Sequence, residues 1–158
     1  MRLPKPSTCT LYKTLDRMPR GRRIFSYAFT RKAPFFATIK PTFLEIRPHL
    51  ARVRLPNRRA VHNHIGTIHA IAVCNGLEAA MGALAEATTP SGMRWLPKRM
   101  EVDYLAKATT DLVCTAETTE ADWDGAPDVP VDVRAVRADD TVVARGVIHL
   151  WVTPRPTG

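Results

Sequence analysis

The chain has 158 residues and a mass of 17.6 kDa, which is the size of one domain. Its composition, 45% hydrophobic and 24% charged, is that of a globular protein and excludes global disorder. The formal net charge of +8 is unevenly placed: residues 1–62 hold 15 basic and two acidic residues, whereas residues 63–158 hold 8 basic and 13 acidic residues. This asymmetry favours an anionic partner for the basic half: nucleic acid, a membrane surface or a phosphorylated small molecule.

Neither secretion nor integral membrane association is expected. The longest apolar runs are interrupted by His, Asn or Arg before the roughly 20 residues that a membrane span needs. The first 23 residues contain no apolar core of signal-peptide length. The widely spaced Cys9, Cys74 and Cys114 are typical of reduced thiols, and they form no cysteine zinc motif. We therefore expect a cytoplasmic protein.

Residues 1–38 are predicted to form a basic helical extension. Apolar residues recur there at helical spacing until a proline breaks the pattern: Leu11, Leu15, Met18 and then Pro19. A second short apolar stretch, residues 24–29, ends near Pro34. Because its aromatic residues lie among Arg and Lys, a nucleic-acid or membrane-surface role stays open for this segment. No nucleic-acid-binding motif is present, so we expect no nucleic acid partner.

Residues 39–153 are predicted to form the main domain, with strands on either side of one long helix. Apolar residues alternate with arginine over 50–55, which predicts a half-buried strand, and Phe43 and Leu44 lie in an earlier stretch that fits another. The stretch from about 65 to 88 is apolar on almost every side and predicts a buried central helix. Four strand-like stretches follow it: 99–104, 112–119, 131–135 and 141–152. An α+β fold, with an antiparallel sheet wrapped around one long helix, satisfies this order.

A single carboxylate, Glu78, lies in the middle of the predicted helix among apolar neighbours. Desolvating an unpaired carboxylate costs several kcal/mol or raises its pKa, so such a group is rarely buried without a partner. Glu78 is therefore a candidate functional residue. A partly exposed side chain, or one paired across a subunit interface, is the structural alternative. A nucleophilic role for Cys74 is weaker, because a thiol in apolar surroundings stays protonated.

Polar residues gather directly before the helix, in the sequence His-Asn-His-Ile-Gly-Thr-Ile-His-Ala over residues 62–70. Free backbone N–H groups at a helix N-terminus can hold an anion or a developing oxyanion, and Gly66 permits a tight turn. A simple helix cap at Thr67 is the alternative. The three histidines, His62, His64 and His69, raise the possibility of a metal site. No Cys or Asp nearby completes a ligand set, so we expect no metal.

The pattern Asn63-x-x-Gly66-Thr67-Ile68-His69, followed nine residues later by Glu78, resembles the N-x-x-G-T-(L or I)-H motif and helix carboxylate of hotdog-fold thioesterases. These are the phenylacetate-pathway type and their four-hydroxybenzoyl-CoA relatives. Residues 102–108 resemble the strand after the helix, without its usual proline. The whole chain, basic N-terminus included, looks most like a bacterial hotdog family catalogued as a domain of unknown function.

The resemblance implies roles for individual residues. Glu78 matches the carboxylate that acts as general base on water or as nucleophile, and Asn63 matches the loop residue that orients water or substrate. His69 and the backbone N–H of Ala70 match the oxyanion hole. Ala70-Ile71 replaces the usual Gly-Gly of these enzymes. In the same loop, we expect substrate contacts from three residues: His64, Gly66 and Thr67.

The implied function is an acyl-CoA thioesterase, a hydrolase that works as a homodimer or a tetramer and needs no cofactor beyond the coenzyme A of its substrate. Four arginines lie closest in sequence to the loop, and we expect them to contact the CoA phosphates: Arg52, Arg54, Arg58 and Arg59. Two alternatives remain. One is a non-catalytic acyl-CoA binding module. The other is an enoyl-thioester hydratase or dehydratase using His64 and Glu78, although such enzymes normally carry a Pro-Gly-rich loop after the histidine.

Overall fold

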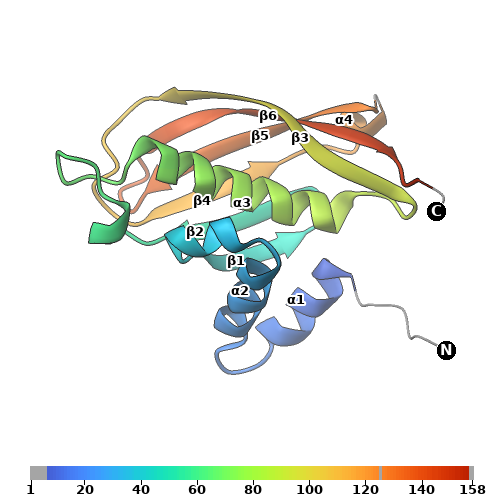
Figure 1. Ribbon diagram of the computed structural model, residues 1–158, viewed down its shortest axis with the longest axis horizontal. Helices are drawn as coiled ribbons and strands as arrows, with labels where there is room; N and C mark the ends of the chain where they lie inside the picture. The colour runs from blue at the N-terminus through green and yellow to red at the C-terminus, as the bar shows by residue number, and fades with distance from the viewer. Residues whose placement is uncertain (1–6, 125, 157–158) are drawn as a thin grey trace.

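The fold is one antiparallel sheet with a long helix packed on one face (Figure 1). The computed structural model describes residues 7–124 and 126–156. The elements are α1 (Thr8–Asp16), α2 (Gly21–Lys32), the 3-10 helix η1 (Pro34–Ile39), β1 (Thr42–Arg47), β2 (Leu50–Leu55), the 3-10 helix η2 (Arg59–Val61), α3 (Ala70–Thr88), β3 (Met93–Tyr104), β4 (Leu112–Glu117), α4 (Ala121–Asp124), β5 (Asp128–Arg137) and β6 (Val142–Pro154). The sheet order β1-β2-β4-β5-β6-β3, wrapped around α3, confirms the expected α+β hotdog fold.

Alternating side chains decide which face of the sheet meets α3. On β2, Ala51, Val53 and Leu55 are buried, whereas the intervening arginines are exposed. Because successive strand residues point to opposite faces, the apolar set can pack under α3 while the arginines remain on the outer face. From the helix side, Leu77 and Met81 are fully buried in the same core.

Helix α3 is the central element of the core. By length and composition alone, α3 could cross a membrane, although the interrupted apolar runs of the sequence predict no such helix. Most of α3 is buried inside the protein. Gly76 lets the helix approach β4 closely, because a Cβ at this position would lie 2.8 Å from the sulfur of Cys114. α3 is therefore shielded by the protein's own sheet.

The start of α3 corrects one prediction. The helix begins at Ala70 and not near 65, because backbone N–H groups before Ala70 donate to carbonyl groups outside the helix. The N–H of Ile68 donates to the carbonyl of Ala108 (3.0 Å), and the N–H of His69 donates to the carbonyl of Val61 (2.8 Å). The cap is also His69 and not Thr67.

Strand β3 is longer than the sequence pattern indicates. It starts at Met93, six residues before the predicted stretch, and runs along β6 at one edge of the sheet. Pro97 lies inside it, next to a register shift between Pro97 and Arg99. A proline is tolerated at a sheet edge because no further strand needs its missing N–H.

The N-terminal helices pack on β1 through an aromatic cluster. The ring of Phe25 lies 5.1 Å from that of Tyr12 and 5.5 Å from that of Phe43, both edge-to-face, and Phe29 lies 4.5 Å from Phe43. Such pairs add about 0.5–1.5 kcal/mol beyond area burial. The hydroxyl of Tyr12 also donates to the carbonyl of Leu44 (2.6 Å). These contacts attach α1 and α2 to the edge of the sheet opposite β3.

Candidate active site

The loop before α3 is held in shape by Asn63. Its side-chain oxygen accepts hydrogen bonds from the N–H groups of Ile65 and Thr67 (both 3.1 Å), and its amide donates to the hydroxyl of Thr67 (2.9 Å). Gly66 takes a positive φ of 79°, which favours glycine. Asn63 therefore acts first as a brace for its own loop, with one amide hydrogen left for another acceptor.

The first turn of α3 presents free donors. The Nδ1 of His69 accepts the N–H of Ile71 (3.1 Å), so the neutral ring carries its hydrogen on Nε2. The N–H groups of Ala70 and Ala72 find no acceptor among the described residues. Ala70 lines a cavity of about 360 Å³ together with Thr67 and Tyr104. Free N–H groups at a helix N-terminus are suited to a carbonyl oxygen that gains negative charge.

Glu78 is half-buried two turns further along α3. Within the described part of the chain it forms neither a hydrogen bond nor an ion pair, although most exposed carboxylates of the sheet are paired. Ile71, 60% exposed, lies on the same outward side of the helix. Glu78 is therefore a carboxylate without a partner among the described residues. It lies with Ile71 on the outward side of the helix, which we call the α3 strip.

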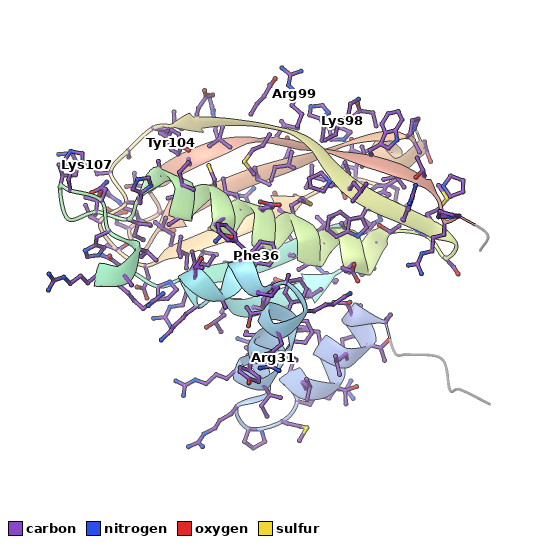
Figure 2. The ribbon with its side chains drawn as sticks, viewed as in Figure 1. Arg31, Phe36, Lys98, Arg99, Tyr104 and Lys107 are labelled. Atoms are coloured by element: carbon purple, nitrogen blue, oxygen red, sulfur yellow. The ribbon has the colours of Figure 1, made fainter. Side chains whose placement is uncertain are left out.

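A cysteine and a tyrosine meet one turn before Glu78. The sulfur of Cys74 lies 2.9 Å from the hydroxyl of Tyr104 on β3. Burial, together with this hydrogen bond, raises the pKa of Tyr104 to about 12, so its hydroxyl stays protonated near neutral pH. Figure 2 shows Tyr104 and Lys107 at the end of the molecule where α3 begins. The sequence pattern indicates only a strand at Tyr104, and the fold adds this residue to the wall of the site.

Asn75 is the polar residue of α3 that sequence reasoning missed. It is 5% exposed, and its amide donates to the hydroxyl of Thr38 in η1 (3.2 Å). Thr38 in turn donates to the carbonyl of Phe35 (2.8 Å), so the side-chain oxygen of Asn75 stays without a partner among the described residues. Asn75 also lines a second cavity, of about 270 Å³, with His69. An asparagine three residues before the carboxylate in an apolar helix was the available signal.

The five remaining predicted residues, which are four arginines and His64, do not lie together. Arg52 and Arg54 lie on the outer face of the sheet, away from α3, and Arg54 is paired with Asp111. Arg58 donates to the carbonyl of Thr38 (3.0 Å). The other two, Arg59 and His64, are exposed. The structure thus places Asn63, Thr67 and Ala70 on the wall of one cavity, with Gly66 in the same loop, whereas His69 lines the second cavity. It does not gather the four arginines at this site.

The histidines do not form a metal centre in the described part of the chain. The ring of His62 is hydrogen-bonded to Asn57 through Nε2, and His69 is engaged with the helix backbone. No three His, Cys, Asp or Glu side chains in residues 7–124 and 126–156 lie close enough to hold an ion.

Comparison with known proteins assigns the chain to a family and identifies structures with the same fold. A model of the family described as "Domain of unknown function (DUF4442)" matches residues 21–152, whereas no curated protein matches. A crystal structure from structural genomics, target APC5556, is 40% identical with a TM-score of 0.82, covering 94% of this chain and 99% of that one. A thioesterase family protein from Silicibacter pomeroyi is 19% identical, with a TM-score of 0.70 and coverage of 87% and 100%.

A thioesterase from Haemophilus influenzae has the same fold at 8% identity, with a TM-score of 0.67 and coverage of 76% of this chain and 82% of that one. At such identities the likeness concerns the fold alone. The family match, by contrast, extends over most of the chain, from the start of α2 into the last strand, β6. This chain is a hotdog-fold protein that belongs to the DUF4442 family.

Proposed function

We propose that this protein is an acyl-CoA thioesterase in which Glu78 acts as general base or nucleophile. The observation that carries the proposal is the unpaired, half-buried Glu78 on the same helix as the free N–H of Ala70. Thioester hydrolysis needs both elements: a positioned carboxylate and a donor aimed at the developing oxyanion. The thioesterase names of two structural neighbours agree with this chemistry.

The two elements must come from different copies of the chain. Ala70 and Glu78 are eight positions apart, which along an α-helix is about 12 Å. One thioester carbonyl cannot touch both groups across that distance. We therefore propose a homodimer in which the loop of one copy faces the α3 strip of the other. The exposed Ile71 on that strip and the exposed Leu96 on edge strand β3 supply apolar surface for it.

The reaction follows from the donors and the base. The carbonyl oxygen of the thioester accepts the N–H of Ala70, with Nε2–H of His69 as a second donor. In the general-base route, Glu78 takes a proton from water while the water oxygen bonds to the carbonyl carbon. The C–S bond then breaks, and the departing thiolate receives that proton. The products are a free carboxylic acid and coenzyme A.

The decisive experiment replaces Glu78 by Gln, which keeps the volume and removes the charge. Across a panel of acyl-CoAs we expect the hydrolysis rate to fall on the order of 10²- to 10⁴-fold. Glu86→Gln is the matched control: it lies two turns later on α3, where Glu86 pairs with Lys32 and Thr8, and it should keep wild-type activity. Circular dichroism and sedimentation should be unchanged in both variants.

Other results select the alternatives. Full activity of Glu78→Gln would refute the assigned role of this residue. A wild-type protein that binds CoA esters without hydrolysing any of them is a binding module. Hydration of enoyl thioesters that is lost in His64→Ala would instead identify a hydratase.

A further inference from the structure

A large hollow lies on the N-terminal side of the molecule, outside the site described above. It has a volume of about 600 Å³ and lies between α2, η1 and the start of β1. Pro34, Ala37 and Lys40 recur every third residue and line it, as the three-residue period of a 3-10 helix requires. Phe35 and Thr38 line the second cavity, beside His69. The short helix η1 is therefore a partition between this hollow and the start of α3.

Three cations surround the hollow without a carboxylate partner among the described residues. Arg23, Arg31 and Lys40 line it, and none forms an ion pair with any described residue. Their neighbours Arg22 and Lys32 are paired with carboxylates, which shows that pairing is available on the same helix. Three unpaired cations around one concave surface attract a ligand with several negative charges.

The rest of the lining is apolar or already hydrogen-bonded. The hydroxyls of Ser26 and Thr30 donate to backbone carbonyls of α2, so they do not serve as free donors. The ring of Tyr27, 66% exposed, offers a flat surface, with the guanidinium of Arg31 at 6.0 Å from its centre. An aromatic ring that carries phosphate groups combines both features: the ring stacks and the phosphates meet the cations.

We propose that this hollow binds the phosphorylated nucleotide end of coenzyme A, the 3′-phosphate and pyrophosphate meeting Arg23, Arg31 and Lys40. The substrate class rests on the proposed function. The ligand's remaining arm then passes over η1, past the exposed Phe35, toward His69 and the N-terminus of α3. Arg52 and Arg54 lie on the far face of the sheet, so in this proposal they do not contact the CoA phosphates, contrary to the expectation from the sequence. The phosphate contacts come from Arg23, Arg31 and Lys40 instead.

The test compares two substrates that share the acyl group. One is an acyl-CoA, and the other is the acyl thioester of N-acetylcysteamine, which has no nucleotide. In the triple variant Arg23→Gln, Arg31→Gln, Lys40→Gln we expect KM for the acyl-CoA to rise on the order of 10- to 100-fold, with kcat little changed. KM for the N-acetylcysteamine ester should stay at the wild-type value. The control Lys13→Gln, Arg17→Gln, Arg20→Gln removes the same charge from α1 and the following turn and should leave both KM values unchanged.

Binding measured without turnover separates this proposal from the proposed function. Calorimetry with adenosine 3′,5′-bisphosphate should show binding to the wild type and to Glu78→Gln, and weaker binding to the Arg23/Arg31/Lys40 triple variant. Inorganic phosphate and anionic lipid vesicles are the competing probes. The nucleotide site is overturned if KM rises equally for both substrates, if the acyl-CoA KM does not rise, or if vesicles bind and the bisphosphate does not. If no thioester is hydrolysed but the bisphosphate binding behaves as stated, the enzyme function fails and the site stands.

Discussion

The N-terminal helices and the sheet use their basic residues differently. On the sheet, most arginines and lysines lie beside a carboxylate, as in the pairs Arg54–Asp111, Arg134–Glu117 and Arg137–Asp139. Residues 7–41 contain eight basic residues and one acidic residue. Six of the eight basic residues form no ion pair with the described chain. Paired charges serve the architecture of the sheet. The unpaired ones are not needed by the fold and are available to an anion from outside.

Packing follows the same division. Where α3 meets β4 the interior leaves no room, so that even a single Cβ at Gly76 would lie 2.8 Å from the sulfur of Cys114. Between α2 and η1, by contrast, lies the hollow of about 600 Å³. A close-packed interior is the rule in proteins, and a retained hollow on the surface is typical of a ligand site. The difference indicates that the N-terminal helices, besides packing on the core through Phe25, add a concave surface that the sheet and α3 do not provide.

The largest expected effects come from truncating large buried side chains in the two regions, which share one hydrophobic core. Leu77→Ala, under the sheet, should lower the free energy of unfolding by about 2–5 kcal/mol, and Phe25→Ala, in the aromatic cluster, by about 3–5 kcal/mol, because both side chains are buried. Denaturant unfolding should show one transition in each variant. A separate early transition in Phe25→Ala alone would mean that the N-terminal helices unfold independently, which would make the division sharper than the structure indicates.

An intermediate effect is expected from adding one methyl group to α3. Gly76→Ala should destabilise the protein by about 1–2 kcal/mol, because the new Cβ lies 2.8 Å from the buried sulfur of Cys114. Gly82→Ala is the matched control on the same helix, since its Cβ would meet only Trp95 at 3.6 Å, an ordinary contact. This control should be neutral or gain up to about 1 kcal/mol from helix propensity. Thermal unfolding measures both, and equal melting temperatures would contradict the close approach of α3 to β4.

The smallest effect concerns the pairing of charges on the sheet. The N–H of Asn57 (2.7 Å) and the guanidinium of Arg54 lower the pKa of Asp111 in the folded protein. The resulting stability is present above the unfolded pKa of about 3.9 and is lost as the pH falls through the folded value. In Asp111→Asn we expect the loss of stability between pH 6 and pH 3 to be smaller than in the wild type.

The size of this difference should be about 1 kcal/mol or less, since the pair is partly exposed and screened by water. Asp140→Asn, an exposed aspartate without an ion pair in the described chain, is the control and should follow the wild-type pH profile. Identical profiles for Asp111→Asn and the wild type would show that this charge pair has no structural role.

Several features could be predicted from the amino-acid pattern because they depend on local periodicity. The alternation over β2 and the apolar run of α3 indicate which residues are buried, and the order of the elements then favours one sheet around one helix. The motif around Asn63 and Glu78 was equally readable. The start of α3 was not, because the backbone bonds that exclude residues 65–69 from the helix go to Val61 and Ala108. The first half of β3 was hidden by Pro97, which is acceptable only because the strand lies at the edge.

The sequence by itself determined the fold class, the buried helix and the excess of positive charge before the motif, since each follows from composition and spacing. Only the tertiary structure decided where those charges lie. Arg52 and Arg54 are close to the motif along the chain, but strand alternation places them on the far face of the sheet. Arg23, Arg31 and Lys40 are distant from the motif along the chain. The packing of α2 on β1 and of η1 against α2 brings them around one hollow, which η1 separates from the start of α3. Proximity in space depends on long-range packing, which no local pattern encodes.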